Sequence, residues 1–185
     1  MEIERLYSAF LNATEISTDT RTLKKDALFF ALSGPNFDGN RFATEALEKG
    51  AQQVVVDDPK TLPNHPKILL VENTLTALQQ LATHHRKKLN TPIIALTGSN
   101  GKTTTKELIR EVLQKKFKVL ATSENLNNHI GVPLTLLQLT EQHKIGIIEM
   151  GANQLNEIRN LCEIALPNWG YITNFGKAHL EGFGS

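Results

Sequence analysis

Cysteine is nearly absent from the sequence, which has only Cys162 among its 185 residues. A single cysteine excludes an internal disulfide and a metal site built from several thiolates. Long apolar runs are also lacking, since none approaches the roughly 18 residues of a membrane span. The opening residues, MEIERLYSAF, are acidic and amphipathic rather than basic and then apolar, so we expect no signal peptide.

An excess of one charge is lacking as well. Lys and Arg number 20, Asp and Glu number 19, and the formal net charge is +1. This balance gives no electrostatic reason to expect nucleic acid or an anionic membrane as a partner. The sequence also has no internal repeat and no low-complexity segment. We therefore expect a cytoplasmic, monomeric globular protein that acts on small molecules and does not insert into a membrane.

The spacing of apolar residues predicts two α/β domains. In the first we expect a short N-terminal helix and a loop over residues 33–42. Further helices are expected over 41–49 and 74–89, and strands over 27–32, 53–58 and 67–71. The tripeptide Asn-Thr-Pro at 90–92 breaks the pattern, so the boundary is placed there and the domains are taken as residues 1–88 and 89–185.

Strands and helices alternate more regularly in the second predicted domain. Strands are expected over 93–97, 118–122, 144–151 and 169–174. Helices are expected over 103–117, from Pro133 onward, and over 155–165. This alternation is typical of a mainly parallel sheet with helices on both faces.

The stretch TGSNGKTTTKE, residues 97–107, carries a phosphate-loop pattern between a predicted strand and a predicted helix. Glycines let backbone N–H groups turn toward an anion, and the start of the helix favours negative charge. We expect a nucleotide to contact Gly98, Ser99, Asn100, Gly101, Lys102, Thr103 and Thr104. Leu96 stands where the usual pattern has its first glycine, and a simple glycine turn before a helix is the alternative.

An acidic residue follows a second apolar strand in the same predicted sheet. Glu149 comes directly after IGII, and the carboxyl ends of parallel strands lie at one edge of a sheet. P-loop proteins hold Mg²⁺ from this position, directly or through water. Glu149 is therefore a candidate ligand for the Mg²⁺ of bound ATP, and a solvated glutamate at a strand end is the alternative.

Four stretches of the second domain resemble the Mur ligase family: residues 97–107, NLNNHIGVPLTLL at 125–137, IIEMGANQLNEI at 147–158 and TNFGKAHLEGFGS at 173–185. In the first domain, STDTR at 17–21 and GPNFDGNRF at 34–42 resemble the family's uridine-nucleotide domain. The resemblance covers nearly the whole chain in the family's order. It implies an α/β fold with a small N-terminal uridine-nucleotide domain, followed by part of a P-loop, mainly parallel-sheet ATPase domain.

The resemblance also implies an activity. It points to an ADP-forming amide ligase of peptidoglycan synthesis that uses ATP and Mg²⁺ to join D-alanyl-D-alanine to UDP-N-acetylmuramoyl-tripeptide. ATP would phosphorylate the terminal carboxylate of the tripeptide, and the amine would attack the resulting acyl phosphate. A sibling ligase adding the third amino acid and folylpolyglutamate synthase share the GKTT loop and stay as alternatives. A non-catalytic nucleotide-sugar binding module is the alternative from a different class.

The resemblance assigns roles to residues of the second domain. Lys102 would contact the β- and γ-phosphates, Thr103 and Glu149 would hold the first Mg²⁺, and His179 would help hold a second. Asn127 and Asn128 would line the muropeptide or phosphate site, although turn chemistry also explains asparagines there. Position 129 is a histidine where the family more often has an acidic residue, so its role is open.

In the first domain the resemblance points to two segments for the uridine nucleotide. Asp19, Thr20 and Arg21 follow a predicted strand, and the guanidinium fork of arginine suits a diphosphate. A helix cap or a turn explains this segment equally well. The predicted uracil and phosphate loop comprises Asn36, Phe37, Asp38, Gly39 and Asn40. Because the family continues past HLEGFGS, we expect this chain to be an N-terminal portion that does not complete ligation alone.

Overall fold

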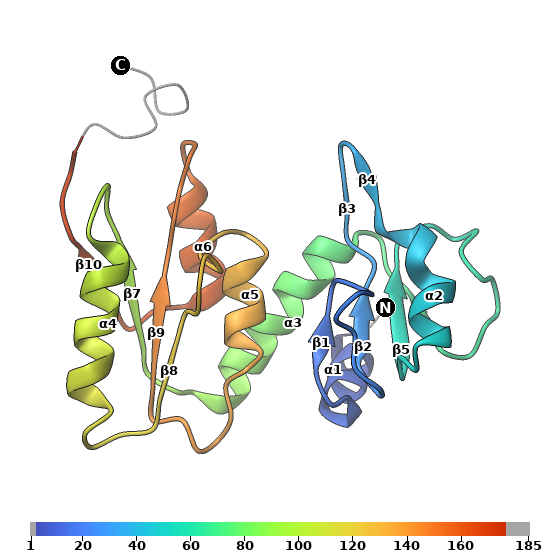
Figure 1. Ribbon diagram of the computed structural model, residues 1–185, viewed down its shortest axis with the longest axis horizontal. Coiled ribbons are helices and arrows are strands. Elements are labelled where there is room, and N and C mark those ends of the chain that lie inside the picture. The colour runs from blue at the N-terminus through green and yellow to red at the C-terminus, as the bar shows by residue number, and fades with distance from the viewer. Residues whose placement is uncertain (1–2, 177–185) are drawn as a thin grey trace. The chain divides into compact units, whose positions relative to one another are not determined.

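The computed structural model describes residues 3–176 and divides into two compact units, one ending at Leu81 and the other beginning at Ala82 (Figure 1). This division falls inside helix α3, Thr74–Leu89, seven residues before the predicted domain boundary at 88/89, which stays a prediction. The last turns of α3 belong to the second unit through their hydrogen bonds. Thr83 Oγ1 donates to Ile164 O at 3.1 Å, and His85 Nε2 lies 2.9 Å from Leu139 O.

The first unit is built on a four-stranded parallel sheet in the order β1-β2-β5-β6. Its strands are β1 Ile16–Ser17, β2 Leu28–Phe30, β5 Gln53–Val56 and β6 Ile68–Leu70. Its helices besides α3 are α1 Ile3–Asn12, the 3₁₀ turn η1 Gly39–Phe42 and α2 Ala43–Glu48. All three residues of β2 are buried, as expected for a strand covered on both faces.

The segment predicted as a loop, residues 33–42, is more ordered than expected. It contains a short antiparallel hairpin, β3 Ser33–Gly34 and β4 Phe37–Asp38, and then η1. The helix predicted over 41–49 accordingly begins as a 3₁₀ turn and becomes α-helical only at Ala43. The side chain of Asp38 caps this turn by accepting a hydrogen bond from the N–H of Asn40.

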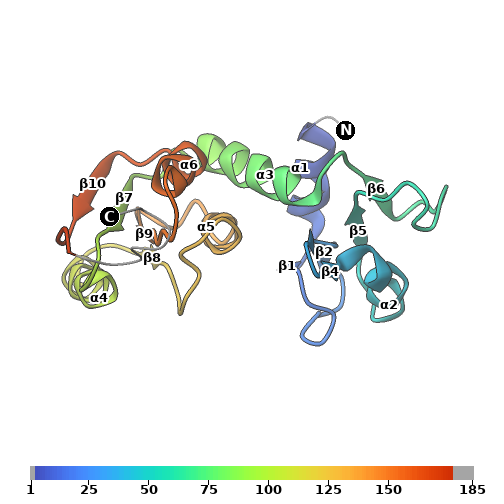
Figure 2. The same ribbon diagram turned by 90° about the horizontal axis from the view of Figure 1, so that it is seen from above.

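The second unit has a parallel sheet in the order β10-β7-β9-β8, which confirms the predicted fold class. Its strands are β7 Ile93–Thr97, β8 Val119–Ala121, β9 Ile145–Glu149 and β10 Trp169–Ile172. Its helices are α4 Lys102–Leu113, α5 Gly131–Leu136 and α6 Glu157–Ala165. Helix α4 covers one face of this sheet, and α5 and α6 cover the other (Figure 2).

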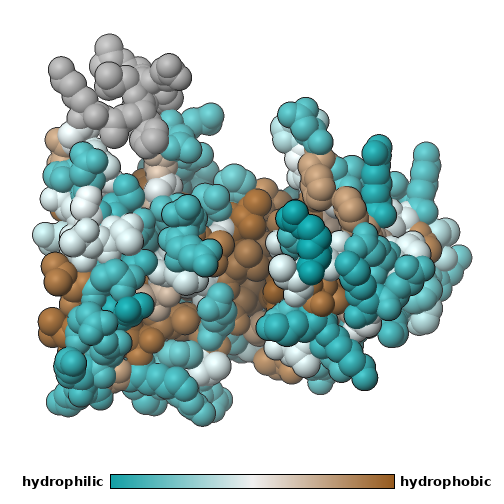
Figure 3. Space-filling model, in the orientation of Figure 1, coloured by the Kyte–Doolittle hydropathy of each residue, from teal (hydrophilic) through white to brown (hydrophobic). Residues whose placement is uncertain are grey.

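Helix α4 packs against the sheet in an unexpected register. Leu108 and Val112 are apolar and lie on one face of the helix, but these side chains are 63% and 71% exposed. The residue that α4 buries instead is Lys106, at 2% exposure. On the face seen in Figure 3, apolar residues accordingly appear at the surface over α4.

No helix within residues 3–176 is both long enough and apolar enough to cross a membrane.

Candidate active site

The loop between β7 and α4 has the backbone of an anion-binding turn. Gly98 and Gly101 have φ angles of 135° and 78°. Residues other than glycine rarely adopt this backbone conformation. A Cβ on Gly98 would lie 2.1 Å from Thr173 Oγ1, so glycine is required there by space as well. The segment after β10 holds the loop, since the N–H of Ser99 donates to Asn174 O at 3.3 Å. The loop is thus fixed at the carboxyl edge of the sheet.

Lys102 is the first residue of α4, one position earlier than predicted. Its Nζ donates to Gly98 O at 2.8 Å, so the ammonium folds back over the loop. Thr103 and Thr104 follow and are exposed. The first N–H groups of a helix have no partner within the helix, and no side chain caps α4. Lys102 and the start of α4 therefore present positive charge and N–H donors at one place.

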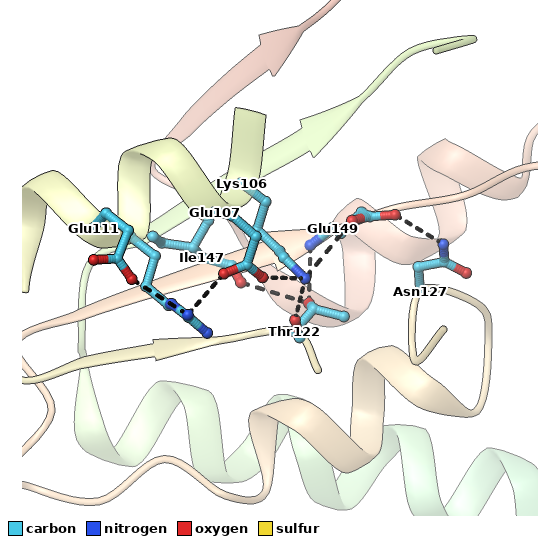
Figure 4. Close-up of polar contacts among 8 residues, drawn as sticks. Lys106, Glu107, Glu111, Thr122, Asn127, Ile147 and Glu149 are labelled. Atoms are coloured by element: carbon cyan, nitrogen blue, oxygen red, sulfur yellow. Dashed lines mark hydrogen bonds and ion pairs between the residues drawn. The ribbon is translucent and has the colours of Figure 1, made fainter. Parts of the chain in front are cut away.

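Glu149 ends β9 beside Leu96 of β7, so it lies at the same edge of the sheet as the loop. Glu149 is buried, with 2% of its surface exposed, so it is not a solvated glutamate at a strand end. The side-chain amide of Asn127 donates to Oε1 at 3.0 Å (Figure 4). Oε2 is buried without a hydrogen-bond partner among the described residues. A buried oxygen of this kind is costly unless a cation binds it, which fits a metal ligand.

Lys106 is a functional candidate that the sequence interpretation missed. Its Nζ donates to Thr122 O at 2.5 Å and lies 3.0 Å from Glu107 Oε1 and 3.9 Å from Glu149 Oε2 (Figure 4). The available signal was its spacing, because residues four apart share a helix face and Lys102 was already placed at the site.

The two asparagines predicted at this site do different things. Asn127 faces Glu149, and its carbonyl oxygen accepts from the N–H of Gly151 at 2.8 Å. Asn128 Oδ1 accepts from the N–H groups of Ile130 and Gly131 at 3.0 and 2.9 Å, where α5 begins. This is the turn chemistry that was the alternative for Asn128. His129 is exposed, and His179 lies outside the described residues.

Within residues 3–176, no group of three or more His, Cys, Asp or Glu side chains is arranged to hold a metal ion. Mg²⁺ is commonly held by one or two carboxylates together with substrate phosphates and water. A single buried carboxylate beside a phosphate loop fits that pattern and does not fit a metal cage made entirely of protein ligands.

In the first unit, Asp19 and Arg21 form a forked ion pair. Arg21 Nε lies 2.9 Å from Asp19 Oδ1, and Arg21 Nη2 lies 2.6 Å from Asp19 Oδ2. These hydrogen bonds hold the pKa of the Asp19 carboxyl at about 2. The Arg21 side chain is 85% exposed, so its remaining donors face solvent. Thr20 is buried, and its carbonyl accepts from Lys49 Nζ at 3.0 Å.

The predicted uracil loop divides into an exposed part and a structural part. Asn36 is exposed, and Phe37 is 56% exposed while its ring stacks on Phe42 at 5.6 Å between centroids. Asn40 is buried instead: its amide donates to Asp57 at 2.8 Å and its Oδ1 accepts from the backbone of the same residue.

The Asn40 side chain is therefore hydrogen-bonded inside the protein, and its role as a direct ligand stays a prediction. Asp38 caps η1, and the hydrogen bond from the Asn40 side chain lowers the pKa of the Asp38 carboxyl. Gly39 approaches the backbone of Leu32 so closely that an added Cβ would lie 2.3 Å from its oxygen. These three residues shape the loop that Asn36 and Phe37 present.

Comparison with known protein families shows which family the chain resembles. Residues 12–86 match the Mur ligase family, catalytic domain, and residues 96–185 match the Mur ligase middle domain. The chain belongs to the Mur ligase family. The first match ends within helix α3 and the second begins within β7, and the second contains the phosphate loop and Glu149.

Relatives of this Mur ligase chain are longer than it is. UDP-N-acetylmuramoyl-tripeptide–D-alanyl-D-alanine ligase from Bacillus subtilis is 44% identical over 92% of the chain, which spans 37% of that relative. MurF from Acinetobacter baumannii matches with a TM-score of 0.88 at 35% identity, over 99% of this chain and 43% of its own. MurF from Thermotoga maritima in complex with ADP matches with a TM-score of 0.83 at 34% identity. The match covers 92% of this chain and 39% of the Thermotoga maritima chain.

Proposed function

We propose that this chain supplies the uridine-nucleotide domain and part of the ATP-binding domain of a ligase that adds D-alanyl-D-alanine to UDP-N-acetylmuramoyl-tripeptide. The observation that carries the proposal is the pairing of a glycine loop and Lys102 with the buried, unpaired Oε2 of Glu149 at one sheet edge of a Mur ligase chain. The name of the Bacillus subtilis relative supports the choice of substrates, and the ADP complex of the Thermotoga maritima protein supports the nucleotide.

The proposed reaction has two steps. An oxygen of the tripeptide's terminal carboxylate attacks the γ-phosphorus of ATP, and the bond to the leaving ADP breaks. The amine of D-alanyl-D-alanine then attacks the acyl phosphate carbon, the C–N bond forms, and inorganic phosphate leaves as the amine gives up a proton. Such transfers depend mainly on positioning and on neutralising the charge of the phosphoryl group.

The second unit offers the groups that such positioning needs. The loop N–H groups and the Lys102 ammonium would bind the β- and γ-phosphates. The Thr103 hydroxyl and Glu149 Oε2 would hold Mg²⁺, and Asn127 would keep the Glu149 carboxylate in place through Oε1. When bound, the cation supplies charge neutralisation at the phosphates. A role of His179 in holding a second cation rests on the sequence motif alone.

The first unit would bind the uridine nucleotide. The free donors of Arg21 suit the diphosphate, with Asp19 holding the guanidinium in place. The exposed ring of Phe37 offers a surface for uracil, and Asn36 beside it offers an amide. Since the chain spans less than two-fifths of the Bacillus subtilis relative, we propose that ligation needs further residues. Monomeric state and cytoplasmic location stay predictions.

Calorimetric titration of the chain with UDP-N-acetylmuramoyl-tripeptide tests the substrate class. We expect binding of the muropeptide and none of dihydrofolate, the control ligand for the folate alternative. Arg21→Ala should weaken muropeptide binding roughly 10- to 100-fold, because a forked charged contact to the diphosphate is lost. Arg5→Ala, a change at another exposed arginine of the same unit, is the matched control and should have little effect. Binding of the folate alone would overturn the assignment.

A further inference from the structure

Lys106 is a buried charge of the second unit that the proposed reaction leaves without a role. It lies one helical turn after Lys102 on α4, with its side chain 2% exposed. A buried ammonium is costly unless it is paired and hydrogen-bonded. Its partners therefore indicate what it does.

The partners of Lys106 hold its ammonium in a fixed place. Nζ donates to the carbonyl of Thr122 at 2.5 Å and pairs with Glu107 at 3.0 Å. Thr122 is itself buried, and its hydroxyl accepts the backbone N–H of Glu149 at 2.9 Å. Thr122 thus holds both groups, the ammonium through its carbonyl oxygen and the backbone of Glu149 through its hydroxyl (Figure 4).

The distance from Lys106 Nζ to Glu149 Oε2 is 3.9 Å, which is close for a charge pair and too long for a hydrogen bond. The positive charge of Lys106 consequently attracts Oε2, but Oε2 accepts no hydrogen bond among the described residues. A divalent cation bound to Oε2 would sit beside an ammonium that its own hydrogen bonds hold in place. Like charges this close repel strongly in buried surroundings.

We propose that Lys106 is the resident counter-charge of Glu149, which stabilises the empty site and prevents a divalent cation from binding tightly before the nucleotide. This inference rests on the proposed function, since it takes Glu149 as the cation's carboxylate. The nucleotide phosphates bring negative charge that offsets the ammonium, so the cation binds together with the nucleotide. Lys106 thereby makes cation and nucleotide binding depend on each other.

The test measures Mn²⁺ binding to the full chain, from the signal of free Mn²⁺ in electron paramagnetic resonance, with and without ADP. Lys106→Met should tighten binding of Mn²⁺ alone by roughly tenfold or more, because the repelling charge is gone. The same variant should have a lower Tm without metal, and Mn²⁺ should raise its Tm more than that of the unchanged protein. Lys87→Met, at an exposed lysine of the second unit, is the matched control and should change neither quantity.

Glu107→Gln provides a second test that does not empty the buried position. The Glu107 side chain is 37% exposed, and its charge offsets part of the ammonium's charge. Removing that charge should weaken Mn²⁺ binding about threefold, the opposite direction to Lys106→Met. Glu111→Gln, on the same helix with a 53% exposed side chain, is its matched control.

The outcomes separate this inference from the proposed function. If the unchanged chain binds no Mn²⁺ with ADP, the proposed assignment of the nucleotide and cation site is wrong. If it binds Mn²⁺ with ADP but folded Lys106→Met binds Mn²⁺ alone no more tightly, Lys106 has only a structural role. Should Lys106→Met not fold, unchanged or tighter binding in Glu107→Gln overturns the inference.

Discussion

Replacing Lys102 by methionine is expected to weaken binding of Mg·ADP to this chain roughly 30- to 100-fold. Methionine keeps most of the side chain's length but removes the charged donor that would reach the β-phosphate, and hydrogen bonds to charged groups carry about 1.5–3 kcal/mol. Calorimetric titration of ADP at saturating Mg²⁺ measures the change. The variant also loses the hydrogen bond from Lys102 to Gly98 O, but the loop's contacts to Thr173 and Asn174 do not involve the Lys102 side chain, so the loop backbone should keep its shape.

Lys115→Met is the matched control for Lys102→Met. Lys115 is exposed just beyond the end of α4, so its replacement removes one positive charge at a distance from the loop. If ADP affinity fell equally in both variants, ADP binding would depend only on the overall charge of the unit. Undiminished binding in Lys102→Met would mean that the loop between β7 and α4 does not bind the phosphates.

The second large effect is expected at Glu149. Glu149→Gln keeps the shape of the side chain but replaces the buried, unpaired Oε2 by a neutral amide group. Affinity for Mn²⁺ in the presence of ADP should fall about 100-fold or more. Losing a ligand should cost more than the roughly 10- to 100-fold that results when a residue hydrogen-bonded to a ligand is changed. Binding of ADP in EDTA should stay within about twofold, since the loop and Lys102 are unchanged.

Two further variants sharpen the Glu149 result. Asn127→Ala removes the donor to Oε1 and should reduce Mn²⁺ affinity about tenfold, less than the loss of the carboxylate itself. Glu141→Gln removes an exposed acid of the same unit and should have little effect. If Glu149→Gln retained full Mn²⁺ affinity with ADP, the cation would have to be held elsewhere.

The sequence predicted the parts of the site that depend on chain order. A strand, a glycine loop and a helix in succession place Lys102 at the carboxyl edge of a parallel sheet, and a second strand ending in Glu149 reaches the same edge. Both placements follow from local pattern and from one rule about parallel strands. The burial of Glu149 and its contact with Asn127, 22 residues away, depend on packing that no local pattern contains.

Helix α4 illustrates why the spacing of apolar residues alone does not identify Lys106. Its apolar residues predict a buried face that includes Leu108 and Val112, yet the helix turns Lys106 to the sheet. A lysine is seldom fully buried, so periodicity assigns it to the solvent side. What reverses this assignment is the carbonyl of Thr122 and the carboxylates of Glu107 and Glu149, which together accommodate the ammonium.

Asn40 illustrates the same limit in the first unit. An asparagine that follows a glycine in a predicted loop is equally suited to bind uracil or to cap a turn. The structure gives it a partner 17 residues away, Asp57 at the end of β5, and the side chain is then fully occupied. Phe37 stays a candidate because its ring remains exposed.

A crystal structure of this chain with Mg·ADP would show whether the loop, Lys102 and Glu149 form one site for nucleotide and cation. The expected result has the β-phosphate against the N–H groups of residues 98–103 and Lys102 Nζ, with Mg²⁺ between Thr103 Oγ1 and Glu149 Oε2, directly or through one water. Lys106 should keep its bond to Thr122 in that complex. Nucleotide phosphates bound away from the loop, or a cation that touches neither Thr103 nor Glu149, would contradict the account.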